Sequence, residues 1–180
     1  MTSPAAPPLR RRLHAIAAAA LAAIALAACP AEPTPAGAAT ADALAGTWSW
    51  PVSPRPAVTR PFDLERPYAA GHRGIDLAAE PGSPVLAPAG GVVRFAGFVV
   101  DRPVLSIDHG GGVVSSFEPV DAEVAQGDVV LAGQRVGTLS AAVEHAPSGG
   151  LHLGARLEGG YVDPRGLLGT IPRSVLLPLG

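Results

Sequence analysis

Beyond about residue 50, the chain consists mainly of short stretches in which apolar residues alternate with small or polar ones. Glycine and proline separate these stretches, and none of them has the apolar period of an amphipathic helix. Alternation with a period of two is typical of strands that bury one face. The pattern predicts strands at 92–100, 104–109, 113–117, 129–131, 135–139 and 151–157. We therefore predict an all-β fold, with an antiparallel β-sandwich or β-sheet core.

The first residues follow a different pattern, because three arginines at 10–12 precede an apolar run at 13–28. This order is typical of an export signal, and the run is too short and too alanine-rich for a permanent membrane span. We therefore predict a helical signal segment at 1–29. Its end, Leu26-Ala27-Ala28-Cys29, is similar to the bacterial lipoprotein box, in which the cysteine carries the lipid.

Cys29 has two interpretations, and both predict export to the cell envelope. A lipid on Cys29 would anchor the protein to the outer face of the cytoplasmic membrane, which is the form we expect. An ordinary cleavage site at the same place would leave the protein secreted.

Composition divides the rest of the chain into a linker, a domain and a tail. Residues 30–46 contain mostly Ala, Pro, Thr and Glu, with little to bury, and are predicted to be a flexible linker. The folded domain is predicted at 47–168, beginning with Trp48 and Trp50, for which core packing and stacking on a glycan both remain open. The tail is predicted at 169–180.

Charge and cysteine content narrow the range of functions. All thirteen basic residues are arginines, and without the signal segment ten of them remain against fifteen acids, a net charge of −5. This balance argues against a nucleic-acid partner. Cys29 is the single cysteine, so the chain forms no internal disulfide and no cysteine-based metal site. We expect a monomer.

Two imidazoles and a carboxylate, His72, Asp76 and His152, are the candidate metal ligands. Two nitrogens and one oxygen are a ligand set typical of a catalytic zinc ion with its fourth position open. On a straight strand His72 and Asp76 would stand about 13 Å apart, so the chain must fold back between them. Gly71 and Gly74 supply the backbone freedom for that turn.

A short internal sequence repeat suggests that the core arose by duplication. The segment Gly82-Ser83-Pro84-Val85-Leu86-Ala87 is similar to Gly127-Asp128-Val129-Val130-Leu131-Ala132, and each precedes a turn and a valine-containing strand. Because Gly, Val and Ala are abundant in this chain, chance similarity is the alternative.

The order of these motifs over about residues 50–168 resembles that of the lysostaphin/LytM-type zinc endopeptidases. The motifs are His-x-x-x-Asp at 72–76, Gly82-Ser83-Pro84-Val85, Ile107-Asp108-His109-Gly110, Gly127-Asp128-Val129-Val130 and Leu151-His152-Leu153. The resemblance implies a β-sheet core of the duplicated hybrid motif type and zinc held by His72, Asp76 and His152. It also implies that the substrates are peptidoglycan peptides.

The chain departs from the family pattern at two histidine positions beside the metal. Gly150 stands where the closing His-x-His motif has its first histidine, and Pro119 stands where a second family histidine is usual. A group that takes the proton from water and steadies the oxyanion is commonly worth about 10²–10⁴-fold in rate. Glu118 and His145 are the candidate replacements. In the alternative interpretation, Glu118 is an ordinary charge at the end of a strand and His145 is a solvated residue of a loop.

The sequence leaves two functions open and excludes a third. The first is a zinc endopeptidase that cuts peptidoglycan cross-links, and the second is a zinc-binding but catalytically silent relative that binds the wall or regulates another hydrolase. The third, a lipoyl or biotinyl carrier, requires a lysine, and the chain has none. Arg60 and Arg73 are candidates for binding a substrate carboxylate, and His109 is predicted to lie in a hairpin turn.

Overall fold

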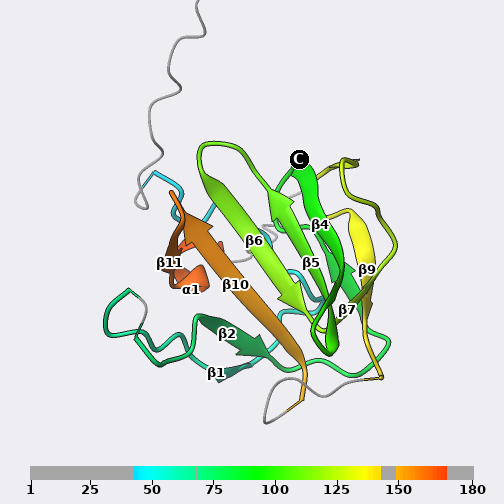
Figure 1. Ribbon diagram of the computed structural model, residues 1–180, viewed down its shortest axis with the longest axis horizontal. Coiled ribbons are helices and arrows are strands. Elements are labelled where there is room, and N and C mark those ends of the chain that lie inside the picture. Colours follow the sequence, from blue (N-terminus) through cyan, green and yellow to red (C-terminus); the bar gives the residue numbers. More distant parts are fainter. Residues whose placement is uncertain (1–42, 68, 143–148, 170–180) are drawn as a thin grey trace, which may run out of the picture. The chain divides into compact units, whose positions relative to one another are not determined.

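The computed structural model describes residues 43–67, 69–142 and 149–169 (Figure 1). All of these residues fall within one compact unit. The predicted signal segment with Cys29, most of the predicted linker, His145 and residues 170–180 lie outside the described residues. Among the residues described, no helix is both long enough and apolar enough to cross a membrane.

Two antiparallel sheets make up the fold. The strands are β1 (Val58–Arg60), β2 (Gly74–Leu77), β3 (Pro84–Leu86), β4 (Gly91–Val99), β5 (Arg102–Asp108), β6 (Val113–Glu118), β7 (Val120–Ala122), β8 (Val129–Val130), β9 (Arg135–Leu139), β10 (Leu151–Leu157) and β11 (Gly160–Val162), and the one short helix described is α1 (Pro164–Leu167). The larger sheet has the order β1-β2-β10-β6-β5-β4-β8, with β11 also paired to β10, and the smaller sheet has the order β3-β9-β7 (Figure 1).

The all-β prediction is confirmed. Each of the six predicted strands is present, with ends shifted by no more than two residues. The sequence pattern missed the strands β1, β2, β3, β7 and β11. These are short, and β2 is buried at all four positions, so it shows no alternation of apolar and polar residues.

Strand register separates the two faces of the larger sheet. Leu153 on β10 lies opposite Ile75 on β2 and opposite Phe117 on β6. All three are fully buried in the hydrophobic core, to which the smaller sheet also contributes side chains. The next position along β10, His152, lies opposite Asp76 and Glu118. Because successive strand residues point to opposite faces, these polar residues share the other face, called the site face below.

The duplicated segments form the same local structure in both copies. Gly82 donates its N–H to the carbonyl of Leu139, and Leu139 donates back to Ser83. In the second copy, Gly127 donates to Val93, and Val93 donates back to Asp128. In each copy, the short strand pairs with the strand that follows the other copy: β3 of the first copy pairs with β9, and β8 of the second pairs with β4. This shared hydrogen-bond pattern favours duplication over chance similarity.

The two tryptophans at the start of the domain pack against its other end. Trp48 is 2% exposed in the core, and its backbone N–H donates to Leu167. The indole N–H of Trp50 donates to the carbonyl of Gly169, while Arg55 lies 4.4 Å from the ring centroid of Trp50. Core and edge packing therefore accounts for both tryptophans.

His109 follows β5 in a hairpin turn, as predicted, and links three elements. Its Nδ1–H donates to the carbonyl of Gly90 (2.9 Å), its Nε2 accepts from the Ser115 hydroxyl (2.8 Å), and its ring lies 5.2 Å from that of Trp48. Burial lowers the pKa of His109, although the Gly90 carbonyl and the Asp108 carboxylate oppose the shift.

Folding stability is therefore expected to fall in mild acid. With a folded pKa below the unfolded value of about 6.5, His109 contributes stability that is complete above pH 6.5 and is lost as the pH falls through the folded value. Urea unfolding of metal-free protein at pH 7 and pH 5 measures this. The drop in midpoint should be smaller in His109→Gln, and an equal drop in both proteins would contradict the assignment.

Candidate metal centre

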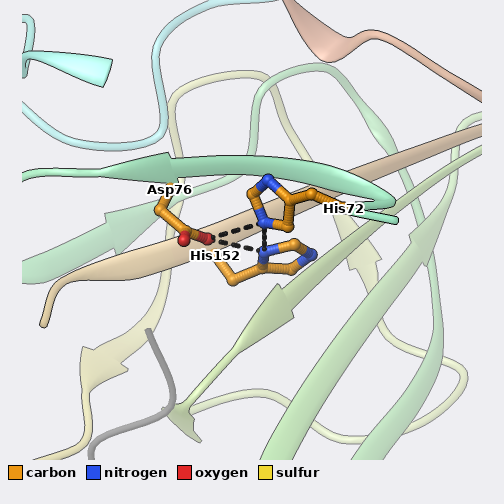
Figure 2. Close-up of side chains that lie close together, drawn as sticks. All are labelled: His72, Asp76 and His152. Atoms are coloured by element: carbon orange, nitrogen blue, oxygen red, sulfur yellow. Dashed lines mark hydrogen bonds and ion pairs between the residues drawn. The ribbon is translucent and has the colours of Figure 1, made fainter. Parts of the chain in front are cut away.

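His72, Asp76 and His152 converge on the site face, as Figure 2 shows. Nε2 of His72 lies 3.1 Å from Oδ1 of Asp76 and 3.1 Å from Nδ1 of His152. The remaining side of the triangle, from Nδ1 of His152 to Oδ1 of Asp76, is 2.8 Å. The three residues are 7%, 2% and 8% exposed, so this polar cluster is almost closed to bulk water.

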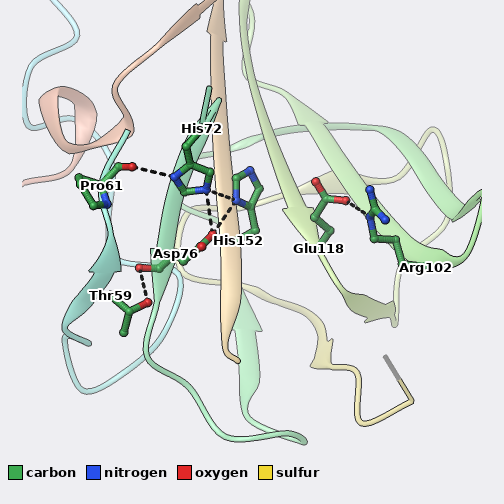
Figure 3. Close-up of polar contacts among 7 residues, drawn as sticks. All are labelled: Thr59, Pro61, His72, Asp76, Arg102, Glu118 and His152. Atoms are coloured by element: carbon green, nitrogen blue, oxygen red, sulfur yellow. Dashed lines mark hydrogen bonds and ion pairs between the residues drawn. The ribbon is translucent and has the colours of Figure 1, made fainter. Parts of the chain in front are cut away.

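A fold in the chain before β2 brings His72 back toward Asp76. Backbone hydrogen bonds join His72 and Asp63 in both directions, and the close approach leaves no room for a Cβ on Gly71, which would meet the Asp63 carbonyl. The imidazole Nδ1 of His72 lies 2.7 Å from the carbonyl oxygen of Pro61 (Figure 3). A carbonyl can only accept, so Nδ1 carries the proton and the Nε2 lone pair faces Asp76 and His152.

The donor set fits a divalent cation. Nε2 of His72, Oδ1 of Asp76 and Nδ1 of His152 are three electron-pair donors brought within hydrogen-bond distance of one another, and at most one proton can lie between any two of them. Zinc bound tetrahedrally at about 2.0–2.1 Å separates its ligand atoms by about 3.3 Å, close to the sides of this triangle. The residues present therefore fit zinc, with the fourth ligand position left open.

Electrostatics keep His152 suited to binding a metal. Burial lowers the pKa of His152, while the Asp76 and Glu118 carboxylates oppose the shift and His72 adds to it. A lowered pKa favours the neutral imidazole, and only the neutral ring has a lone pair to give to a metal.

Residues 70–164, just over half of the chain, match the sequence profile of peptidase family M23. The chain belongs to peptidase family M23. This confirms the resemblance to the lysostaphin/LytM-type enzymes. The matched segment contains all three converging residues and both halves of the duplication.

The M23 relationship extends to a mycobacterial relative and to solved structures. Uncharacterized protein Rv2891 of Mycobacterium tuberculosis is 44% identical over 142 residues, covering 76% of this chain and 57% of its own. A zinc-containing peptidase from Vibrio cholerae superimposes with a TM-score of 0.59 at 21% identity, over 71% of this chain and 41% of its own. A putative M23 peptidase from Pseudomonas aeruginosa superimposes with a TM-score of 0.53 at 27% identity, over 69% of this chain and 51% of its own. The chain thus spans between 41% and 57% of the length of these three proteins.

Gly150 leaves no room for the histidine that M23 proteins usually have at this position. Its φ is 94°, and a Cβ built there would meet the carbonyl of Leu77. A histidine would need a different backbone path at the start of β10, because residues with side chains rarely adopt this conformation. The local backbone is therefore adapted to glycine.

Glu118 is next to the candidate metal centre, and it forms an ion pair. It lies opposite His152 in the β6–β10 register, and its Oε2 accepts from Nε of Arg102 at 2.7 Å (Figure 3). Arg102 also donates to Asp101 at 2.8 Å. His145, the other proposed replacement, lies outside the described residues.

The sequence interpretation missed Pro61 and Arg102, which each hold one polar group of the site. Pro61 acts through a main-chain carbonyl, which every residue has, so its residue type carries no signal. Arg102 lies between the predicted strands at 92–100 and 104–109, and its pairing with Glu118 depends on the β5–β6 register.

Gly74 packs directly beneath the imidazole of His152. A Cβ at Gly74 would stand 2.6 Å from Nε2 and 2.7 Å from Cε1 of this ring, and it would also meet the carbonyl of Leu153. Gly74→Ala is therefore expected to displace the ring and weaken zinc binding at least tenfold, as measured by competition with a chromogenic chelator.

The control for this substitution is Gly166→Ala, because a Cβ on Gly166 meets nothing within 4 Å. That variant should bind zinc like the wild type. Unchanged zinc affinity in Gly74→Ala would show that the ring position does not determine binding.

Proposed function

We propose that this M23 protein is an exported zinc endopeptidase that cleaves peptide cross-links of peptidoglycan. The observation that carries the proposal is the convergence of His72, Asp76 and His152 on one face of the larger sheet. Membership of a peptidase family supplies the reaction class, and no second group of three such residues occurs among those described.

Each residue of the centre has a part in the proposed reaction. Zinc held by the three ligands would lower the pKa of a water molecule to about 7 and polarise the scissile carbonyl. Asp76 and the two imidazoles would hold the ion, and the Pro61 carbonyl keeps His72 in the tautomer that can bind it. Glu118, opposite His152 and oriented by Arg102, accepts the proton of the attacking water on its carboxylate.

The test of this proposal is release of new amino groups from purified peptidoglycan by the zinc-loaded protein. Release should stop with a chelator and return when zinc is restored. His152→Ala protein should release none. Peptidoglycan that stays intact after long incubation with fully zinc-loaded protein would exclude the peptidase.

A second candidate is a zinc-binding M23 protein without activity, which binds the wall or regulates another hydrolase. The backbone at Gly150 favours it, since this segment accommodates no histidine beside the metal. Saturable binding to intact peptidoglycan with no release of amino groups would support this alternative.

Export and lipid attachment complete the proposal. The apolar run and the lipoprotein-like end at Cys29 support a protein anchored to the outer face of the cytoplasmic membrane. Membrane fractionation of the wild type and Cys29→Ser separates anchored from secreted protein.

A further inference from the structure

Two arginines pack against one tyrosine on the larger sheet. The guanidinium carbon of Arg156 lies 4.6 Å from the ring centroid of Tyr161, and that of Arg73 lies 5.7 Å from it. Both distances are measured to the same ring, so the two cations lie within about 10 Å of each other, the Debye length in 0.1 M salt. Each cation is therefore within the field of the other.

Neighbouring groups hold both guanidiniums in place without neutralising them. Arg73 donates to the carbonyl of Ala69 (2.9 Å), and Arg156 donates to the Tyr161 hydroxyl (2.7 Å). In the described part of the chain, neither arginine forms an ion pair, whereas Arg102, Arg135 and Arg165 each pair with a carboxylate. A guanidinium has five N–H donors, so several remain for a ligand on each side chain.

The arginine pair lies on the site face. Arg156 is four residues from His152 on β10, which places it on the same face about 13 Å along the strand. Tyr161 lies directly opposite Arg156 in the β10–β11 register, and Arg73 follows the metal-ligand candidate His72 in the chain. Since β2 and β11 pair with successive parts of β10, the metal centre and the arginine pair lie one after the other along one strand.

A small cavity adjoins this arrangement. It has a volume of about 230 Å³ and lies between the loop at 62–67 and residues 159–161 at the start of β11, with Tyr161 as a shared wall. Phe62 and Leu64 give it apolar lining, and the charges of Glu65 and Arg66 offset each other there. The cavity is smaller than a typical site for a drug-sized ligand, so it suits a single residue of a bound chain.

We infer that Arg73 and Arg156, held against Tyr161, bind the free carboxylate of a substrate peptide. Guanidinium forks match carboxylates in geometry, and stacking on the ring orients them before the ligand arrives. A peptide spans at most about 3.3–3.6 Å per residue, so a separation of about 13 Å places the carboxylate about four residues from the bond at the metal centre. The inference rests on the proposed function for the identity of the substrate, and it selects peptides with a free carboxyl end.

Equilibrium binding of two peptides to the full chain tests this without turnover. The probes are N-acetyl-Ala-D-Ala-D-Ala as the free acid and as its C-terminal amide, titrated by calorimetry with zinc-loaded and with chelated protein. The acid should bind about tenfold more tightly than the amide in both states. Arg73→Gln and Arg156→Gln should each bring this preference below about threefold, with the affinity for the amide unchanged.

Arg94→Gln is the matched control, because Arg94 is an exposed arginine of the same sheet that is not part of this cluster. It should keep the tenfold preference. Equal binding of acid and amide, no binding of either, or the same loss in Arg94→Gln would overturn the inference. Peptidoglycan cleavage is measured in parallel: cleavage without carboxylate preference removes this inference alone, and preference without cleavage removes the peptidase activity alone.

Discussion

The His152→Ala protein is expected to lose its zinc. One of three converging ligand atoms disappears, and the remaining pair, His72 and Asp76, forms a two-coordinate site. Removing even a partner of a zinc ligand typically weakens binding about 10–100-fold, so loss of the ligand itself should weaken it by at least about 100-fold. Metal analysis after dialysis should find about one zinc per wild-type chain and almost none in the variant.

The matched control for this prediction is His109→Gln. His109 is also a partly buried histidine with both ring nitrogens hydrogen-bonded, but it does not belong to the converging group. This variant should keep one zinc per chain. Stoichiometric zinc in His152→Ala, or none in the wild type, would contradict the metal centre, and with it both the peptidase and the silent zinc-binding alternative.

Alternation made the long strands of the larger sheet predictable. In β5 and β6, buried and partly exposed residues alternate at every position, as the apolar pattern implied. β2 gave no such signal, because Gly74 and Asp76 are buried on the site face while Ile75 and Leu77 are buried in the core. Of the two strands that carry metal-ligand candidates, β10 was therefore predictable from the alternation of apolar and polar residues, and β2 was not.

The three converging residues were predictable, since histidine and aspartate in this order and spacing have a chemical meaning by residue type. Their geometry was predictable only in part. The expected fold in the chain between His72 and Asp76 is present, but it is held by Asp63 and Pro61, which act through main-chain groups. Such contacts follow from the path of the backbone, and residue type alone does not reveal them.

Glu118→Gln is expected to lower the rate of peptidoglycan cleavage by about 10²–10⁴-fold, the usual contribution of a general base. The amide keeps the size of the carboxylate and still offers an oxygen to Arg102, but it cannot take up a proton. Zinc content should remain near one per chain, because Glu118 is not among the three converging residues. The measurement is the initial rate of amino-group release at matched zinc loading.

Asp121→Asn is the control for this change in charge. Asp121 is an exposed carboxylate three residues further along the chain, in β7 of the smaller sheet, so its neutralisation tests the effect of net charge alone. Its rate should stay within about threefold of the wild type, since exposed charges interact weakly in water. If Glu118→Gln and Asp121→Asn lose equally little activity in an active enzyme, Glu118 is not the base. His145, the other candidate replacement, then becomes the first residue to replace.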